Sequence, residues 1–374
     1  MDIPAWPQAG ERELELLRAV LESPQWGGFH PFVREFEESF AKYQHAAYGV
    51  GAFNGTVTLE AALSLLGVTL GDEVIVPAIS FISTATAVSR VGATPVFVDL
   101  EPWTFNLDPQ CVEEAITTRT RAIIPVHFGG TPCPMDALSG LAARYGVALI
   151  EDAAHAQGSE YRGRRMGSFG EYGSFSFQNG KVLSSGEGGM LVTNSEKRAI
   201  EATAFINQGR KTGESFYKHF TLGTNFRMTA FQAAVLIAQF EALPDQIARR
   251  MKGAALLKSL LSDVEEVVWQ EQAPEVTQNS FYLLPGRLRN ARVSRDEFCS
   301  KLAASGVPCT PFYPFPLYRN PLYQQEESCR ITPCPIAEAC IEDAFWLSHR
   351  VLLAEPETIE QIAGLARAIL RKDA

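Results

Sequence analysis

The sequence contains no long apolar segment and no excess of positive charge. None of its apolar runs approaches the ~20 residues that a transmembrane helix needs, and its first residues lack the basic and apolar regions of a signal peptide. A formal net charge of −10 over 374 residues argues against nucleic acid or an anionic membrane surface as the main partner. We therefore expect a cytoplasmic protein whose partners are small molecules.

Cysteine is scarce as well, and its seven residues are an odd number. In a chain of this length, that count favours reduced thiols in a cytoplasm over a disulfide framework. Cys329, Cys334 and Cys340 cluster loosely, but their spacing is not that of a familiar zinc site, so we expect no metal. Internal repeats and low-complexity segments are also absent.

The sequence does have an alternation of short apolar runs and amphipathic helices. Continuous apolar runs separated by helical periodicity are typical of a mostly parallel α/β sheet covered on both faces. Ligands of such sheets bind at the carboxyl ends of the strands. The predicted helices cover 11–22, 31–43, 83–91, 111–116 and 135–145, and the predicted strands cover 73–77, 95–99, 122–126, 147–150 and 190–193.

The character of the chain changes near residue 245. A strong helix is predicted over 230–243, and we expect Pro244 to end it because proline cannot donate the next helical hydrogen bond. The residues beyond it indicate a smaller α/β unit. We therefore expect a large domain of residues 1–245, including the N-terminal segment, and a small C-terminal domain of residues 246–374.

One lysine lies in a context that suggests chemistry. Phe175 and Phe177 alternate as in a strand, and Lys181 follows at the mouth of a glycine-rich loop. A lysine on such a loop is most often a solvated surface charge. Ser176 and Asp152 favour another interpretation, because Ser176 offers a hydroxyl that could hold a phosphate and Asp152 directly follows a predicted buried strand.

An amine, a carboxylate and a phosphate-holding group together are what pyridoxal phosphate (PLP) requires. The amine of Lys181 would form a Schiff base with the cofactor. The carboxylate of Asp152 would keep the pyridine nitrogen protonated, so that the ring acts as an electron sink. The sequence therefore predicts a PLP site at the strand ends, with both residues catalytic.

Four further positions each allow a functional and a structural interpretation. Asn54-Gly55-Thr56 begins a helix, whose free N–H groups and dipole suit an anion, although a plain helix cap is the alternative. Phe81 could stack on a flat ring or be a core phenylalanine. His155 could contact the cofactor ring or be a satisfied structural histidine. Arg227 opposes the dipole of the helix that follows it, which suggests an anion partner, or it is a surface residue.

Together the motifs resemble the DegT/StrS-type sugar aminotransferase family, PLP enzymes of fold type I. The matching runs span most of the chain: 53–56, 76–81, 104–108, 125–127, 151–155, 175–177, Lys181, 186–189 and 225–228. The resemblance implies a large domain with a mostly parallel, seven-stranded sheet and a smaller C-terminal α/β domain. It also implies a homodimer whose two active sites lie at the interface.

The resemblance further implies a role for each matching residue. Lys181 would carry PLP as a Schiff base and shuttle protons, and Asp152 would pair with the pyridine nitrogen. His155 would contact the ring region of the cofactor, and Phe81 would stack on the ring. Gly55, Thr56, Val57 and Ser176 would hold the phosphate. Asn225 would reach the phosphate of the neighbouring subunit's cofactor.

Runs 175–181 and 346–353 look like the branch that holds 3-amino-5-hydroxybenzoate synthases and inosose aminotransferases. Some family members carry histidine in place of the lysine and act as dehydratases, so Lys181 implies transamination. The expected reaction moves an amino group from glutamate or glutamine to a keto-sugar or ketocyclitol, in sugar, aminocyclitol or secondary-metabolite biosynthesis. Arg227, Tyr313 and His349 are candidate substrate contacts.

Two alternatives to this reaction stay open. A dehydratase of the 3-amino-5-hydroxybenzoate synthase type would use the same lysine to aromatise an aminocyclohexenone. A non-catalytic, PLP-binding partner subunit is the other alternative, and the intact set of Lys181, Asp152 and Ser176 disfavours it.

Overall fold

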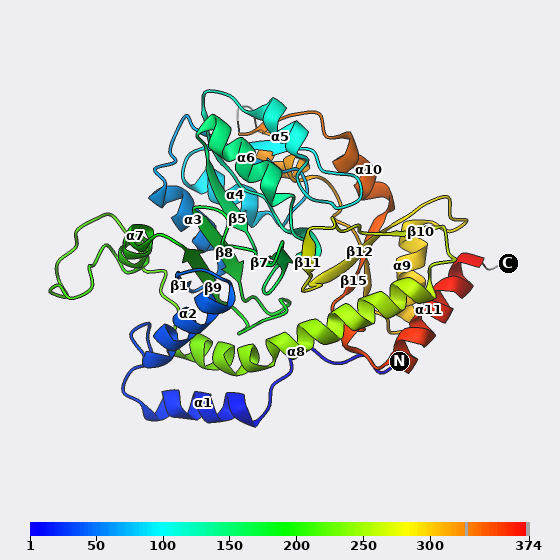
Figure 1. Ribbon diagram of the computed structural model, residues 1–374, viewed down its shortest axis with the longest axis horizontal. Coiled ribbons are helices and arrows are strands. Elements are labelled where there is room, and N and C mark those ends of the chain that lie inside the picture. The colour runs from blue at the N-terminus through cyan, green and yellow to red at the C-terminus, as the bar shows by residue number, and fades with distance from the viewer. Residues whose placement is uncertain (326–327, 372–374) are drawn as a thin grey trace.

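A mixed eight-stranded sheet forms the centre of the computed structural model, which describes residues 1–325 and 328–371 (Figure 1). The last three residues of the expected C-terminal domain therefore lie outside the described part. Strands β8, β5, β4, β2, β3 and β14 are parallel, and β9 is antiparallel to both β1 and β8. In spatial order the strands are β1 (Tyr48–Ala52), β9 (Gly189–Thr193), β8 (Tyr172–Ser176), β5 (Ala148–Asp152), β4 (Thr120–Ile123), β2 (Glu73–Pro77), β3 (Thr94–Val98) and β14 (Arg330–Ile331).

Successive residues of one strand face opposite cores, which explains the continuous apolar runs of the sequence. Ile75 packs in the core formed by one set of helices, whereas Val74 and Val76 pack in the core on the other face. The helices of the first core are α1 (Glu11–Glu22), α2 (Pro31–Tyr43), α5 (Pro109–Ala115), α6 (Met135–Tyr145) and the first half of α8 (Ala230–Leu260). Those of the second are α3 (Gly55–Leu65), α4 (Ser83–Arg90), α7 (Glu196–Ile206) and α10 (Pro335–Asp343).

A second, antiparallel sheet organises the C-terminal part. It packs with helices α9 (Arg295–Ala304) and α11 (Pro356–Arg371) and the second half of α8 around a third core. Its strands, in order, are β10 (Val267–Trp269), β12 (Leu283–Leu288), β15 (Ala344–Ser348) and β13 (Cys309–Pro311). The remaining elements are a small sheet of β11 (Val276–Gln278), β6 (Glu160–Tyr161) and β7 (Arg164–Arg165), and the 3₁₀ turns 128–130, 317–319, 321–323 and 351–353.

The expected fold class is confirmed, with one strand more in the main sheet. Seven strands of that sheet come from the expected large domain, and the eighth, β14, comes from the C-terminal part and pairs with β3. A two-residue strand has no periodicity of its own, so the sequence pattern could not reveal it. Within the described residues, no helix combines the length and the apolar character that a membrane span requires.

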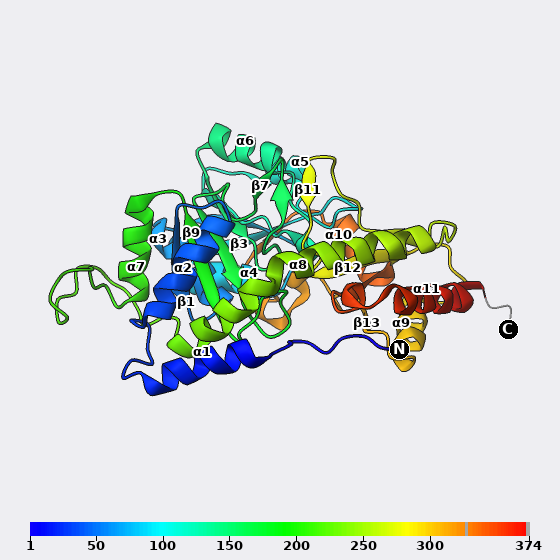
Figure 2. The same ribbon diagram turned by 60° about the horizontal axis from the view of Figure 1, so that its bottom comes forward.

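The prediction that a helix ends at Pro244 is wrong. Helix α8 runs without interruption for 31 residues, with Pro244 inside it, along both parts of the molecule (Figure 2). Proline removes one helical hydrogen bond, but burial of side chains on both sides of it, such as Leu243 and Ile247, outweighs that loss. The division into domains at residue 245 stays a prediction, and a continuous helix crosses it.

Candidate active site

Two neighbouring parallel strands of the main sheet end at the candidate site. Asp152 is the last residue of β5 and Ser176 the last of β8, and the two strands pair with each other. Lys181 follows in the loop between β8 and β9. The carboxyl ends of these strands therefore bring together the three residues from which the sequence predicted a PLP site.

The start of α3 approaches Ser176 so closely that only glycine fits between them. A Cβ atom on Gly55 would lie 2.6 Å from the Cβ of Ser176. The N–H groups of Gly55 and Thr56 belong to the first helical turn and have no acceptor within the helix. The hydroxyl of Thr56 lies 2.8 Å from that of Ser83, which sequence reasoning missed. Backbone donors and hydroxyls thus meet as a phosphate-binding site requires.

Val57 differs from its neighbours in this helical turn. Its N–H donates to Oδ1 of Asn54 at 3.1 Å, so Asn54 caps the helix and occupies that donor. Of the three predicted backbone positions, Gly55 and Thr56 keep their N–H groups available for an anion, and Val57 does not.

The carboxylate of Asp152 is buried and held from two directions. The hydroxyl of Thr84 donates to Oδ2 at 2.8 Å, and the N–H of Ala154 donates to Oδ1 at 3.3 Å. Burial raises the pKa of Asp152, while the bond from Thr84 and the charge of Lys181 oppose that rise. Thr84 lies on α4 far from Asp152 in sequence, and no pattern in the sequence marks it as a partner.

Lys181 is a buried amine without a hydrogen-bond acceptor for Nζ among the described residues. Burial lowers its pKa to about 8, and the charge of Asp152 works against this shift. Nζ lies 4.4 Å from the centre of the Tyr282 ring, so the ring face is its immediate neighbour. An amine with a pKa near 8 is partly neutral at physiological pH and can act as a nucleophile and a base.

The rings of His155 and Tyr282 pack against each other in a tilted arrangement beside the lysine. Their ring centres lie 4.3 Å apart at an interplanar angle of 36°. The N–H of Gly129 donates to Nδ1 of His155 at 3.4 Å, and burial lowers the pKa of His155 well below its ordinary value. The ring is therefore neutral and carries its proton on Nε2. Sequence reasoning missed Tyr282, which lies in a run with no diagnostic pattern.

Three other residues that the sequence predicted as cofactor or substrate contacts differ in their exposure and in their neighbours. Phe81 is 60% exposed, so it is not a core phenylalanine and its ring is free to stack on a ligand. Tyr313 is packed against Phe128 and Trp346, and burial raises its pKa. His349 lies beside the lysine loop, with its Nε2 3.2 Å from the carbonyl oxygen of Gly180.

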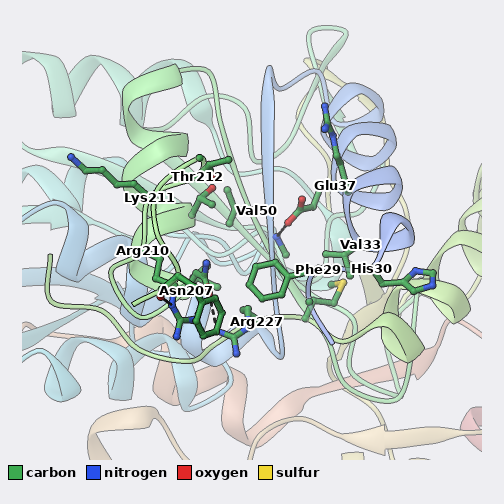
Figure 3. Close-up of a pocket in the computed structure, with 18 of the residues that line it drawn as sticks. Phe29, His30, Val33, Glu37, Val50, Asn207, Arg210, Lys211, Thr212 and Arg227 are labelled. Carbon is green, nitrogen blue, oxygen red and sulfur yellow. Dashed lines mark hydrogen bonds between the residues drawn. The ribbon is translucent and has the colours of Figure 1, made fainter. Parts of the chain in front are cut away.

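Asn225 and Arg227 lie apart from the lysine within one chain. Arg227 lines a cavity of about 700 Å³ between α2, β1 and the loop after α7, and this lining includes neither Lys181 nor Asp152 (Figure 3). Its Nη1 donates to Oδ1 of Asn207 at 2.9 Å, so within the described residues of this chain its hydrogen-bond partner is a neutral amide, and the predicted anion partner stays a prediction. Asn225 is exposed at the base of the same loop and forms a backbone bridge with Asn207.

The comparisons with known proteins agree with this arrangement. The model of the DegT/DnrJ/EryC1/StrS aminotransferase family matches residues 7–366. The chain is 39% identical over 383 residues to the 3-amino-5-hydroxybenzoate synthase of Amycolatopsis mediterranei (strain S699), covering 99% of this chain and 98% of that protein. It is 37% identical over 400 residues to the L-glutamine:scyllo-inosose aminotransferase of Streptomyces griseus, covering 98% and 94%.

A solved structure shares the whole fold. The crystal structure of 3-amino-5-hydroxybenzoic acid synthase superposes with a TM-score of 0.93 at 36% identity, covering 99% of each chain. A buried amine, a buried carboxylate and a phosphate-binding helix start at one sheet edge are groups that fit PLP, the cofactor of this family. The chain therefore belongs to the DegT/DnrJ/EryC1/StrS aminotransferase family and is a PLP-dependent aminotransferase.

Proposed function

We propose that the enzyme transfers an amino group from glutamine or glutamate to a cyclic ketone of the ketocyclitol or keto-sugar class. The observation that carries the chemistry is the buried Lys181 amine, whose pKa is lowered to about 8, beside the carboxylate of Asp152. The choice of substrate class is supported by the relative in Streptomyces griseus, which is named for glutamine and scyllo-inosose. The two substrates are small molecules that use one site in turn.

Each side chain of the site has a task in this proposal. PLP, when bound, supplies an electron sink for the reacting carbon. Lys181 would hold the cofactor covalently before the donor binds and, as a free amine, would move the proton at that carbon, because a partly neutral amine both accepts and returns protons near pH 8. Asp152, oriented by Thr84, supplies a negative charge for the pyridine nitrogen. His155 offers the N–H of Nε2 to the ring region.

The phosphate and the substrate involve the remaining residues. Gly55, Thr56 and Ser176 would hold the phosphate, because their free donors meet at the start of α3. Phe81 offers an exposed ring for stacking. Tyr313 would contact the substrate, since it contributes an aromatic hydroxyl near Asp152 and Tyr282.

Aromatising dehydration is the second candidate. The observation that favours it is the 39% identity to a protein named 3-amino-5-hydroxybenzoate synthase. The same lysine would serve as the base, so the residues of the site do not discriminate between the two reactions. A non-catalytic PLP-binding role has no such support, because the lysine, the aspartate and the phosphate-binding residues are all present.

A substrate screen tests the proposal. Purified holoenzyme is incubated with glutamine or glutamate and with each of several ketocyclitols, keto-sugars and an aminocyclohexenone carboxylic acid. We expect a ketocyclitol or keto-sugar to gain an amine, with the donor converted to its 2-oxo acid, and mass spectrometry detects both products. Loss of water from the aminocyclohexenone, without any amination, would instead identify the dehydratase.

We infer further that two chains form a homodimer with shared sites. The loop between α7 and α8 projects from the body of the molecule (Figures 1 and 2). It exposes four large apolar side chains to solvent: Phe216, Tyr217, Phe220 and Leu222. Exposed apolar groups on a projecting loop favour a protein partner. Asn225, at the base of this loop, would then face the phosphate of the partner's cofactor.

Complementation between two variants tests the sharing of sites. Lys181→Ala subunits and Asn225→Ala subunits are co-expressed with different tags, and the mixed dimer is purified. If the sites are shared, one site of the mixed dimer keeps both residues, and we expect up to half of the wild-type activity per dimer. The Asn225→Ala homodimer must first be shown to be impaired. A verified mixed dimer with no more activity than its parents would mean that each site belongs to one chain.

A further inference from the structure

The N-terminal segment of the chain reaches the loop that carries Lys181. Residues 1–10 have no regular secondary structure and run from the C-terminal part toward α1 (Figure 2). Nε of Arg350 donates to the carbonyl oxygen of Pro4 at 2.7 Å, which fixes the segment on the C-terminal part. Two residues further along, the indole N–H of Trp6 donates to the carbonyl oxygen of Lys181 at 2.9 Å.

A second ring nitrogen holds the neighbouring carbonyl. Nε2 of His349 lies 3.2 Å from the carbonyl oxygen of Gly180. Burial and the charge of Arg250 lower the pKa of His349 well below its ordinary value, so the ring is neutral. A neutral ring that bonds a carbonyl must carry its proton on Nε2. The carbonyls of residues 180 and 181 are therefore each held by one ring N–H.

Trp6 itself is held by its surroundings. The ring of His349 meets the indole edge-on, with ring centres 4.6 Å apart at 88°. The guanidinium of Arg250 lies 5.2 Å from the centre of the indole ring. Arg250 is fully buried; its Nη2 donates to the amide oxygen of Gln246, and its Nε and Nη1 have no hydrogen-bond partner within the described residues. A buried cation needs compensation, and the negative face of the indole provides part of it.

We propose that Trp6 is a positioning residue for the amino transfer, because it fixes the backbone from which the side chain of Lys181 extends. The inference rests on the proposed role of Lys181. A displacement of about 1 Å at a reacting group can cost about 100-fold in rate, so a bond to the lysine's own carbonyl has a direct effect on the chemistry. The donor comes from the N-terminal segment, which lies far from Lys181 in sequence.

Trp6→Phe separates the hydrogen bond from the packing. Phenylalanine keeps a ring against His349 and over Arg250 but has no N–H for the carbonyl of Lys181. We expect kcat to fall about fivefold to tenfold with little change in KM, since one hydrogen bond is lost. We also expect faster hydrogen exchange in the peptide 178–184, with and without PLP, and a shifted midpoint in the pH titration of the cofactor's absorbance.

Trp269→Phe is the matched control. The indole nitrogen of Trp269 has no hydrogen-bond partner within the described residues, and its ring packs on Phe345 in the C-terminal part. Its replacement removes an indole N–H that holds no carbonyl. In this variant kcat, the hydrogen exchange of peptide 178–184 and the midpoint of the absorbance titration should therefore stay at their wild-type values.

The exchange measurement keeps the inference separate from the proposed function, because it needs neither substrate nor turnover. If exchange over 178–184 and the absorbance titration are the same in Trp6→Phe as in Trp269→Phe, Trp6 does not position Lys181. Should Trp6→Phe fail to fold, replacing Trp6 with 3-benzothienylalanine removes the N–H while keeping a ring system of the same size, and unchanged exchange in that protein also overturns the inference. Faster exchange in an enzyme that aminates no ketone would refute the proposed function alone.

Discussion

Lys181→Ala is expected to give a folded protein that transfers no amino groups. Nζ of Lys181 has no hydrogen-bond acceptor among the described residues, so its removal costs the fold little. The reaction loses both the covalent attachment of the cofactor and the proton carrier at the reacting carbon, which corresponds to a rate loss of more than about 10⁴-fold. Activity assays and thermal unfolding measure the two effects separately.

Peptide mapping identifies the lysine directly. Borohydride reduction of the holoenzyme should leave the pyridoxyl label on the peptide that contains Lys181, and a label on another lysine would contradict the assignment. Because burial lowers the pKa of Lys181 to about 8, the neutral amine becomes more abundant as the pH rises through 8. Covalent capture of PLP by the apoprotein should accelerate over that interval. Lys301→Ala, on the surface of α9, is the control and should behave as the wild type.

Asp152→Asn is expected to bind PLP but to react at least about 100-fold more slowly, a loss typical of removing one preorganised electrostatic partner. Asparagine has nearly the same shape and can still accept the hydrogen bond from Thr84. A neutral amide, however, cannot stabilise a protonated pyridine nitrogen. Rapid mixing of the holoenzyme with the amino donor should show the effect in the rate of the half-reaction, with cofactor retention nearly unchanged. An Asp152→Asn enzyme with the wild-type half-reaction rate would exclude the electrostatic role of Asp152.

Thr84→Val provides a graded comparison for the same carboxylate. It removes the hydrogen bond that opposes the rise in the pKa of Asp152, so that pKa should rise further. The carboxylate is the active form, and a higher pKa means that it is protonated first as the pH falls. The loss of activity in Thr84→Val should therefore be small at alkaline pH and increase toward acid. A pH profile that matches the wild type would show that Thr84 does not tune this carboxylate.

The sequence pattern predicts helices and strands whose apolar residues recur at a regular spacing, and it predicts the residues at which they end. Helices α1, α2 and α6 begin and end where the apolar periodicity does, and Asp152 lies at a strand end as expected. These features are local, because each depends on residues within one or two turns of helix or one strand. The positions of Asp152 and Ser176 at strand ends, with Lys181 in the loop that follows, were predictable for the same reason.

The features that escaped prediction depend on contacts between distant segments. Tyr282 covers Lys181, and Thr84 orients Asp152, through tertiary packing that no spacing encodes. The strand β14 exists because β3 offers it a partner. Pro244 was expected to end a helix because its local effect is unfavourable, whereas packing along the whole of α8 determines the outcome.

The continuity of α8 also limits how the molecule can move. A helix of 31 residues is a rod of about 46 Å, and its first half belongs to the core around the main sheet while its second half belongs to the core of the C-terminal part. Hinge rotation needs a few residues whose backbone torsions can change, and the torsions of a hydrogen-bonded helix are fixed. The main sheet, whose strand ends carry the candidate site, and the C-terminal sheet are thus joined by one continuous helix. A rotation of the two parts against each other would therefore have to bend α8, most easily at Pro244, where one helical hydrogen bond is missing.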